Sequence, residues 1–206
     1  MNSENRRLGS VRHDEPQRED NQPDQENGKP SGGLKAEIIS WIQILVTAAC
    51  IAFVLNTFII ANSKVPSGSM ENTIMTNDRV IGFRFSYWFS DPKEGDIAIF
   101  RFPDDESIYY VKRVIGLPGD TIDISDGKVY KNGSETPLDE PYLKEEMFPE
   151  EDMHFEVPED SYFMMGDNRN FSYDARYWDN TFVHRDKIIA KVQFRYWPFN
   201  KMGKLE

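Results

Sequence analysis

One long apolar segment near the N-terminus stands apart from the rest of the chain. From Ile38 to Ala61 the sequence IISWIQILVTAACIAFVLNTFIIA runs for 24 residues without a charged side chain. A helix of that length, rising about 1.5 Å per residue, crosses a hydrocarbon core of roughly 30 Å with some tilt. The apolar core of a cleaved secretory signal is shorter, about 7–15 residues. The pattern therefore predicts an uncleaved transmembrane anchor over residues 36–62, with a buried core helix as the alternative.

Beyond residue 62 the pattern changes to short runs rich in Val, Ile, Phe and Tyr. Clusters of Gly, Pro, Asp and Asn separate these runs, as expected for strands joined by turns. The segment TIDISDGKVYKNG predicts a hairpin that turns at Asp126-Gly127, whereas the acidic, Pro-interrupted stretch 135–160 predicts a long loop. No stretch past residue 62 keeps a helical period over three turns. The pattern predicts a mainly β domain, with strands in segments 79–85, 96–102, 109–116, 161–167 and 187–197.

The first 35 residues are polar, with six Lys/Arg and seven Asp/Glu. Such a composition buries too little apolar surface to fold, so it predicts disorder. Lysines and arginines close to the span are balanced on its two sides, but further arginines in the tail favour a cytoplasmic N-terminus under the positive-inside rule. The expected organisation is a disordered cytoplasmic tail over 1–35, the anchor over 36–62 and an extracytoplasmic domain over 63–206.

Charge and cysteine content narrow the classes of function. The 206-residue chain has a formal net charge of −11, which argues against a broad nucleic-acid surface, because binding the phosphate backbone needs clustered Lys and Arg. A well-solvated surface explains the same acidity. Cys50 is the single cysteine, and the three histidines are far apart and lack the spacing of metal ligands. We expect no intramolecular disulfide, no metal, no cofactor and no nucleic-acid partner.

The motif PSGSM, residues 66–70, places two hydroxyls around a glycine. Gly68 allows a tight turn between Ser67 and Ser69, although Ser-Gly-Ser alone is typical of a plain loop. A nucleophilic serine needs a base within hydrogen-bond reach. None of the three histidines has a recognisable setting for that role, so lysine is the other option.

Lys112 is the candidate base. It lies in YYVKRVIG, on the same strand face as Tyr110 and Val114. A strand lysine usually points to solvent, but burial among apolar groups penalises the ammonium form. To act as a base, Lys112 needs a pKa lowered by roughly two units from about 10.4.

A third segment, MGDNRNFSYDARYW at 165–178, adds polar groups to these two. Ser172 offers a second hydroxyl that could hold the lysine amine. Asp167, Asp174, Arg169 and Arg176 are candidates for structural ion pairs. Read alone, the segment is a turn-rich loop.

Together these segments resemble a known family. PSGSMENTIMTNDRV, YYVKRVIGLPGD and MGDNRNFSYDARYW, with GDIAIF at 95–100, are similar to the ordered motifs of type I signal peptidases, and most to the Gram-positive branch. The resemblance covers roughly residues 38–197, with the apolar span before the motifs. It implies a membrane-bound serine endopeptidase that cleaves signal peptides from secreted preproteins after Ala-X-Ala, and a catalytic domain of antiparallel β-sheet.

The resemblance also implies a role for each matching residue. Ser69 would be the nucleophile and Lys112 the general base, while the Ser67 hydroxyl and the Ser69 N–H would form the oxyanion hole. Ser172 would orient the lysine amine. Two ion pairs, Asp167 with Arg113 and Asp174 with Arg176, would support the site. Shallow pockets for small substrate side chains would be lined by Val65, Met70, Ile74 and Val111.

The implied partners are signal peptides of secreted preproteins, membrane lipid and, as a further option, the protein translocation machinery. Tyr87-Trp88-Phe89 could enter the membrane interface, although a core cluster is an equal alternative.

Two positions depart from the family pattern. Asn72 replaces a usual proline, and Ala175 replaces a usual serine. They affect the rigidity of a turn and one local hydrogen bond, and they remove no proposed catalytic atom. Three alternatives remain open at this stage: a self-cleaving repressor with Ser–Lys chemistry, which would lack an anchor; a non-enzymatic anchored ectodomain; and a Ser–His protease that uses His184.

Overall fold

The computed structural model describes residues 33–205. Helix α1 spans Leu34–Val54, and a π-helical turn, η1, Leu55–Ile59, continues it. The most apolar window of this helical segment has a mean hydropathy of 2.4, and none of that window is buried. A buried core helix is therefore excluded, and the length and composition suit a membrane span. The disorder predicted for residues 1–35 lies outside the described residues, apart from the start of α1.

The helical segment ends earlier than the sequence pattern predicts, because residues 60–62 belong to a strand. Strand β1, Ile60–Lys64, pairs antiparallel with β2, Arg79–Phe83, with Ile60 opposite Phe83 and Lys64 opposite Arg79. Ile60 and Ala61 are as apolar as the helix before them. Hydropathy alone therefore does not mark this boundary.

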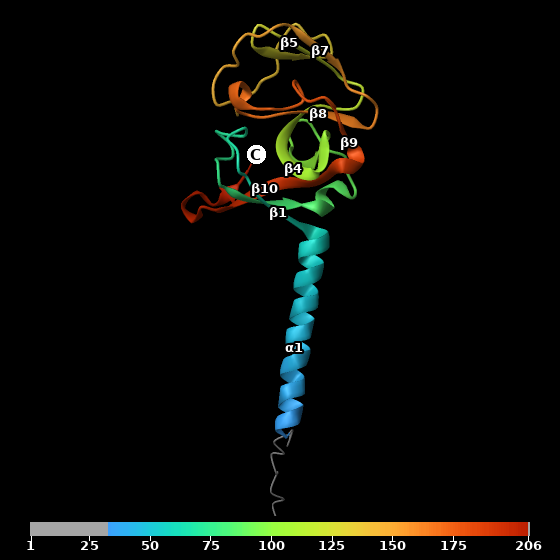
Figure 1. Ribbon diagram of the computed structural model, residues 1–206, viewed down its shortest axis with the longest axis vertical. Coiled ribbons are helices and arrows are strands. Elements are labelled where there is room, and N and C mark those ends of the chain that lie inside the picture. Colours follow the sequence, from blue (N-terminus) through green and yellow to red (C-terminus); the bar gives the residue numbers. More distant parts are fainter. Residues whose placement is uncertain (1–32, 206) are drawn as a thin grey trace, which may run out of the picture. The chain divides into compact units, whose positions relative to one another are not determined.

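The strands form two sheets in which every pairing is antiparallel. In the larger sheet the order is β1-β2-β10-β3-β4-β8-β9, and β11 pairs with β10. Figure 1 shows β1 and β10 at one end of the domain and β5 and β7 at the other. The mainly β, antiparallel fold is confirmed. The remaining members of the larger sheet are β3 Ile97–Phe102, β4 Asp105–Gly116, β8 Ser161–Met165, β9 Val183–His184, β10 Ile188–Trp197 and β11 Gly203–Lys204.

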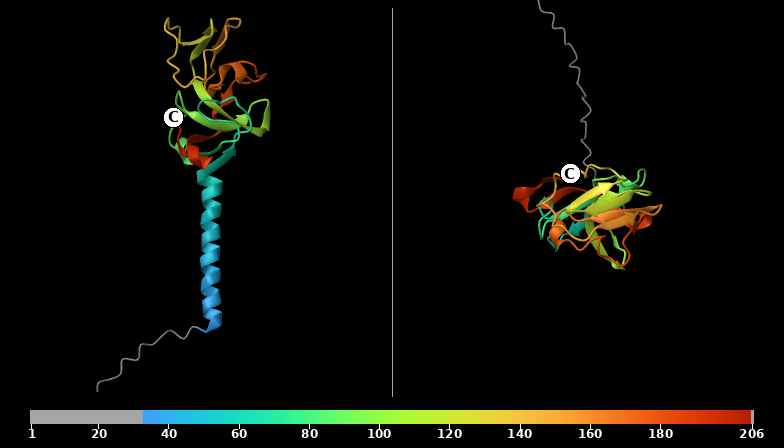
Figure 2. Two further views of the ribbon diagram at one scale, coloured as in Figure 1. Left: turned by 90° about the vertical axis from the view of Figure 1, so that its left-hand side faces the viewer. Right: turned by 90° about the horizontal axis from the view of Figure 1, so that it is seen from above.

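The smaller sheet has the order β6-β5-β7 and contains the predicted hairpin. Its strands are β5 Thr121–Ser125, β6 Lys128–Lys131 and β7 Met153–Glu156. Asp126 and Gly127 both have positive φ, 48° and 71°, as a tight two-residue hairpin turn requires. Strand β7 lies within the stretch expected to be a loop. Figure 2 shows the small sheet from two further directions.

Two apolar clusters hold the domain together. The larger contains Phe100, Val114 and Phe163, and it joins the sheets where Phe163 on β8 meets Phe155 on β7 at 4.7 Å between ring centroids. The smaller cluster packs β1, β2 and β10 around Met70 and other buried residues. Burying one such side chain contributes about 1.5–3 kcal/mol. The larger cluster therefore joins the small sheet to the larger one, and the smaller cluster holds the strands that follow the helix.

Beyond Ile59, the described part of the chain contains only short 3₁₀ turns as helical elements, in agreement with the missing helical periodicity. They are η2 Arg84–Tyr87, η3 Arg169–Phe171, η4 Arg185–Lys187 and η5 Phe199–Lys201. Strand β4 matters most for the site, because its first half is exposed and its second half, from Lys112 onward, is buried. Lys112 lies where this strand enters the core.

Candidate active site

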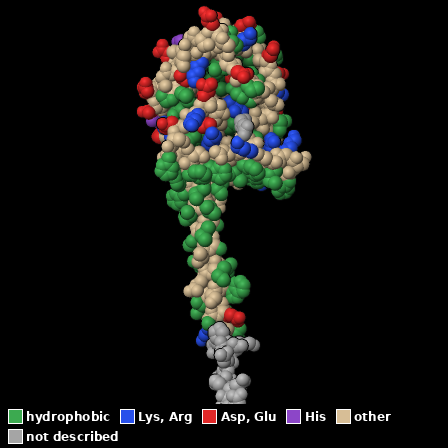
Figure 3. Space-filling view, turned by 180° about the vertical axis from the view of Figure 1, so that it is seen from behind, with side chains coloured by type: hydrophobic (Ala, Val, Ile, Leu, Met, Phe, Trp, Pro, Cys, Tyr) green, Lys and Arg blue, Asp and Glu red, His purple; other side chains and the backbone are tan. Residues whose placement is uncertain are grey.

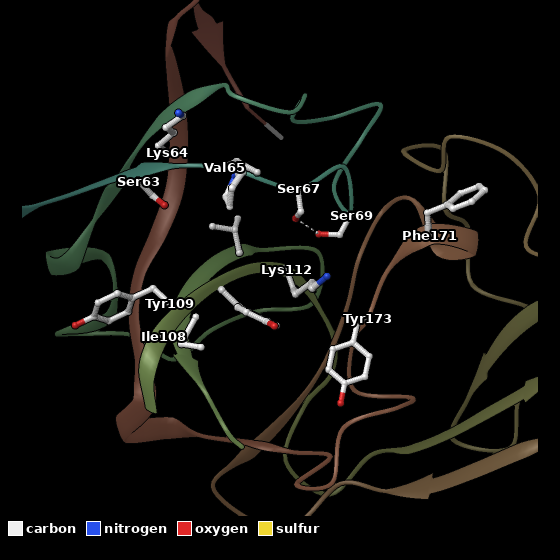
Figure 4. A pocket seen from close by; sticks show the side chains of 13 residues that line it. Ser63, Lys64, Val65, Ser67, Ser69, Ile108, Tyr109, Lys112, Phe171 and Tyr173 are labelled. Atoms are coloured by element: carbon white, nitrogen blue, oxygen red, sulfur yellow. Dashed lines mark hydrogen bonds between the residues drawn. The ribbon is translucent and has the colours of Figure 1, made fainter. Parts of the chain in front are cut away.

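A cleft of about 370 Å³ opens over the exposed half of β4. Figure 4 shows the side chains of Ser69 and Lys112 pointing into the same space from two separate segments of the chain. One segment is the end of β1 with the loop after it, and the other is β4. The lining residues are Ser63, Lys64, Val65, Pro66, Ser67, Ser69, Ile108, Tyr109, Tyr110, Val111, Lys112, Phe171 and Tyr173.

The loop after β1 forms a compact turn around Ser69, which we call the nucleophile turn, residues 66–73. The Glu71 N–H donates to the Gly68 carbonyl at 3.0 Å, and the Thr73 N–H donates to the Met70 carbonyl at 3.1 Å. The Ser67 and Ser69 hydroxyl oxygens are 3.4 Å apart. Only 8% of Ser69 is exposed, so its hydroxyl is held in a largely desolvated position at the edge of the cleft.

Lys112 is buried and its amine has a defined partner. The Lys112 Nζ donates to the Ser172 Oγ at 2.8 Å, and only 3% of the residue is exposed. Burial lowers the pKa of Lys112 to about 8; the nearby Arg176 also lowers it, while Asp174 and Asp167 oppose the change. A neutral amine is therefore accessible at mildly alkaline pH, as a general base requires.

Within the described residues, no hydrogen bond joins the Lys112 amine to the Ser69 hydroxyl. The two groups share one cleft, and Ser172 holds the amine on its own side. Catalytic hydrogen bonds are often long in a free enzyme and tighten when substrate binds. The structure thus brings the amine and the hydroxyl to one cleft without a direct hydrogen bond between them.

Gly166 lets the third segment approach both groups. A Cβ at this position would lie 2.7 Å from Ser172 Cβ and would also overlap the Ser172 hydroxyl and the Ser69 carbonyl. The neighbouring Asn168 binds the nucleophile turn directly: its N–H donates to the Ser69 carbonyl at 3.0 Å and its side-chain amide to the Gly68 carbonyl at 2.9 Å. The turn 166–168 thus fixes Ser69 and Ser172 relative to each other.

Arg113, the residue after the lysine, forms a bidentate pair with Asp167. The Arg113 Nε donates to Asp167 Oδ1 at 2.8 Å and Nη2 to Oδ2 at 2.7 Å, with both side chains buried. Thr73 at the end of the nucleophile turn donates its hydroxyl to the same carboxylate at 2.5 Å. One carboxylate therefore ties β4, the turn after β8 and the nucleophile turn together.

A second buried pair supports the segment after β8. The Arg176 Nε donates to Asp174 Oδ1 at 2.8 Å, and the Gly166 N–H donates to Asp174 Oδ2 at 3.0 Å. These bonds and the guanidinium hold the pKa of Asp174 below its usual range, although burial opposes them. Arg169, also considered for an ion pair, binds Glu140 through two hydrogen bonds of 2.9 and 2.5 Å.

The four residues expected to line substrate pockets separate into two groups. Val65 and Val111 line the cleft. Met70 and Ile74 do not line it, because both are fully buried in the smaller apolar cluster beneath the nucleophile turn. An irregular turn does not reveal from sequence which side chains face outward. On β4 the cleft is lined by consecutive residues, from Ile108 to Lys112, so alternation does not separate the lining residues there either.

Tyr110 was predicted to share a strand face with Lys112, and its ring centroid lies 5.9 Å from the Lys112 amine. Sequence reasoning missed two other contributors to the site. One is Asn168, which the sequence indicates only as a turn residue. Glu140 comes from the acidic stretch 135–160, where no local pattern distinguishes it from its exposed neighbours.

The described histidines lie outside the cleft. His154 pairs with Asp123 on the small sheet, and His184 pairs with Asp186 at 2.8 Å. Both side chains are more than half exposed, at 57% and 58%. The geometry therefore gives no support to a Ser–His arrangement built on His184.

Comparison with known proteins agrees with this geometry. Residues 38–197 match the family described as signal peptidase, peptidase S26. A probable signal peptidase I-2 of Synechocystis is 38% identical over 174 residues, covering 81% of this chain and 78% of that protein. Signal peptidase I S of Bacillus subtilis is 34% identical over 180 residues, covering 82% and 95%.

A solved structure of a signal peptidase I from Enterococcus faecalis is 33% identical and matches with a TM-score of 0.43, over 50% of this chain and 97% of that one. The family match itself extends over more than half of the sequence and includes all three segments that line or support the cleft. This chain belongs to the signal peptidase family, peptidase S26.

Proposed function

We propose that this single-pass membrane protein cleaves signal peptides from preproteins, with Ser69 as the nucleophile and Lys112 as the general base. The observation that carries the proposal is a buried lysine with a lowered pKa that shares a narrow cleft with a serine in a tight turn. A non-enzymatic ectodomain has no use for such a lysine. Membership of the signal peptidase family supports the same activity.

In the proposed reaction, the neutral Lys112 amine accepts the Ser69 proton as the oxygen attacks the scissile carbonyl carbon. The C–N bond then breaks, the lysine delivers the proton to the leaving amine, and an acyl-enzyme ester remains. Water, activated by the same amine, hydrolyses the ester and frees Ser69. The bond from Lys112 to Ser172 keeps the amine aimed into the cleft during these transfers.

The developing oxyanion needs donors fixed in advance. We assign this role to the Ser67 hydroxyl and the Ser69 N–H. Support comes from the nucleophile turn, which keeps the two hydroxyls 3.4 Å apart on the same side of the cleft. The Asn168 bonds to the Gly68 and Ser69 carbonyls leave the turn little freedom to rotate those donors away.

The strands beside the cleft suit an extended peptide. Strand β1 ends the larger sheet, with β2 as its partner, and β4 pairs with β8 only from Arg113 onward. The edges of β1 and of the exposed half of β4 therefore face the cleft with backbone groups available for β-strand addition. Val65 and Val111 contribute apolar side chains to this cleft, as pockets for the small side chains of Ala-X-Ala require.

The apolar helix and nearby aromatic residues support a membrane partner. Tyr87 is buried, so only the other two residues of the predicted aromatic cluster face outward: Trp88 is 55% and Phe89 is 92% exposed. They follow η2, which contacts the π-helical turn η1 at the end of the span. Figure 3 shows hydrophobic side chains gathered at that end of the domain. Aromatic side chains in this position suit the membrane interface.

Charged side chains are also unevenly distributed along the domain. The segment from Lys187 to Leu205 has no acidic side chain but several basic ones, whereas the stretch 135–160 is strongly acidic. Lys187, Lys191 and Arg195 in this segment are paired with Glu106, Asp96 and Asp78. The orientation of the chain therefore rests on the arginines of the tail under the positive-inside rule. We place the tail 1–35 in the cytoplasm and the domain 63–206 outside, where the translocation machinery would deliver its substrates.

Incubation of the full chain in phospholipid vesicles with a signal-bearing precursor tests the proposal. We expect a single cut after a small residue for the natural chain, none for Ser69→Ala or Lys112→Ala, and unchanged cutting for the matched control His184→Ala. Full activity of Ser69→Ala or Lys112→Ala would refute the assignment. Loss of activity in His184→Ala with a native fold would favour the Ser–His alternative.

A further inference from the structure

Asn72 lies within the nucleophile turn and has an unusual backbone. Its φ is 88°, in the left-handed region that asparagine enters more readily than most residues. Its position is three residues after Ser69, and its backbone links Glu71 to Thr73, whose hydroxyl contacts the Asp167 carboxylate. The conformation of Asn72 therefore decides how Ser69 and Thr73 are placed relative to each other.

The Asn72 side chain reaches across to a distant part of the chain. Its amide Nδ2 donates to the Tyr142 carbonyl at 3.1 Å and to the Leu143 carbonyl at 3.3 Å. We call the segment Glu140–Lys144 the strap. Beside this contact, the Lys144 amine binds the Glu71 carboxylate at 3.0 Å, so two successive residues of the nucleophile turn are attached to the strap.

The strap is itself fixed to the supports of the site. The Arg113 guanidinium stacks on the Tyr142 ring at 3.9 Å from its centroid. The Tyr142 hydroxyl donates to Glu140 at 2.8 Å, and Glu140 is nearly buried against Arg169. Arg169 in turn donates from Nε to the Gly166 carbonyl at 3.0 Å. An attachment to the strap is therefore an attachment to the groups that hold Lys112 and Ser172.

We propose that Asn72 is a positioning residue for the nucleophile, which fixes the turn around Ser69 by tethering it to the strap. The inference rests on the proposed role of Ser69. One amide with two hydrogens satisfies two successive strap carbonyls, and the left-handed backbone at Asn72 allows the side chain to reach both. Without the tether, the turn keeps its internal hydrogen bonds but loses its link to the strap on this side.

The tether also accounts for the absence of proline at this position. Proline holds φ near −65°, and a φ of 88° is closed to it. In this chain, two side-chain hydrogen bonds take over the rigidity that a proline ring would give the turn. The same backbone geometry makes glycine the informative replacement, because glycine accepts positive φ and removes the amide alone.

The test compares Asn72→Gly with Asn77→Gly in the full chain. Asn77 lies in the same loop, also has a positive φ, 70°, and makes no side-chain hydrogen bond within the described residues. We expect Asn72→Gly to lower kcat about tenfold, because a looser turn would misplace the Ser69 hydroxyl. KM and the pH profile of kcat/KM should stay close to those of the natural chain, and Tm should fall only slightly, since the two lost hydrogen bonds are exposed. Asn77→Gly should match the natural chain throughout.

Two further variants sharpen the result. Asn72→Pro should lose more activity than Asn72→Gly, because its ring forces the backbone out of the left-handed region. In the double variant with Asn72→Gly and Tyr142→Ala, the fold-loss of kcat should be smaller than the product of the two single fold-losses, since both changes act through the strap. A kcat for Asn72→Gly within twofold of the natural value overturns the inference. So does a loss of kcat that disappears at temperatures well below the Tm of the variant, which would indicate folding alone. Activity of Ser69→Ala would instead overturn the proposed function.

Discussion

Gly166 is the residue at which the parts of the site approach most closely. A methyl group there would overlap the Ser172 hydroxyl and the Ser69 carbonyl, both of which belong to the reacting groups or their supports. Neither can move without displacing the lysine amine or the nucleophile turn. The lack of a side chain at Gly166 therefore allows Ser69 and Ser172 to approach each other this closely.

We expect Gly166→Ala to reduce kcat/KM by roughly a hundredfold or more, the scale on which about 1 Å of misplacement acts. Gly203→Ala is the matched control, because a Cβ there meets nothing within 4 Å. Steady-state kinetics on a precursor peptide would check the difference. Equal activity of the two variants would mean that the 166–168 turn does not position the pair.

At the residue scale, sequence motifs identify the candidate reacting groups and, through the family resemblance, the two ion pairs beside them, Arg113 with Asp167 and Arg176 with Asp174. Ser69, Lys112 and Ser172 each belong to a short sequence motif that can be recognised without the structure. The first two line the same cleft. The Asn72 tether depends on φ and on two carbonyls about 70 positions away, which no local pattern reveals. Burial of Met70 is decided by the path of an irregular turn, so its side chain could not be assigned to a face from sequence.

At the element scale, the pairing of β4 with β8 positions the site. Arg113 lies opposite Met165 in this pairing, and its guanidinium reaches Asp167 just after β8 ends. The buried pair fixes the end of one strand against the other. Removing one partner of a buried pair leaves an uncompensated charge.

Asp167→Asn should therefore destabilise the domain by roughly 3–5 kcal/mol, since Arg113 stays buried without its carboxylate. Asp186→Asn is the control: its pair with His184 is exposed, and such pairs contribute about 0–1 kcal/mol. Denaturant unfolding followed by tryptophan fluorescence would measure both. If Asp167→Asn lowers the free energy of unfolding no more than the control does, the Arg113–Asp167 pair does not stabilise the domain as proposed.

Most strands were predictable because each combines β-branched and aromatic residues with clear turn residues at its ends. Four strands were not predicted, and each has a physical cause. β9 and β11 are only two residues long, too short for a sequence pattern. β1 continues the apolar run of the helix, so composition does not change where the backbone does. β7 is four residues long, and its burial is partial, so an acidic neighbourhood hides it. Both strands are specified by their partners, β2 and β5, across the sheet.

At the scale of the whole molecule, hydrophobic side chains gather at one end of the domain, and acidic side chains are concentrated in the stretch 135–160. The exposed aromatic residues follow η2, which contacts the end of the helical span. This arrangement would hold the cleft close to the membrane surface, where a signal peptide emerges. Enzyme and substrate in the same membrane meet at a high effective concentration.

The double variant Trp88→Ser with Phe89→Ser should lower kcat/KM for a precursor in vesicles several-fold and leave cleavage of a short soluble peptide unchanged, because only the first reaction needs interfacial contact. Phe148→Ser is the control, since Phe148 is also exposed, at 61%, but belongs to the acidic stretch 135–160. Equal losses with both substrates would assign these aromatic residues to folding.

The pH dependence of kcat/KM in the full chain tests the central claim most directly. Burial lowers the pKa of Lys112 to about 8, and only the neutral amine can accept the serine proton. We predict a rate that rises about tenfold per pH unit on the acid side and levels off above about pH 8. A flat profile from about pH 6 to about pH 10, with chemistry rate-limiting, would contradict a lysine base.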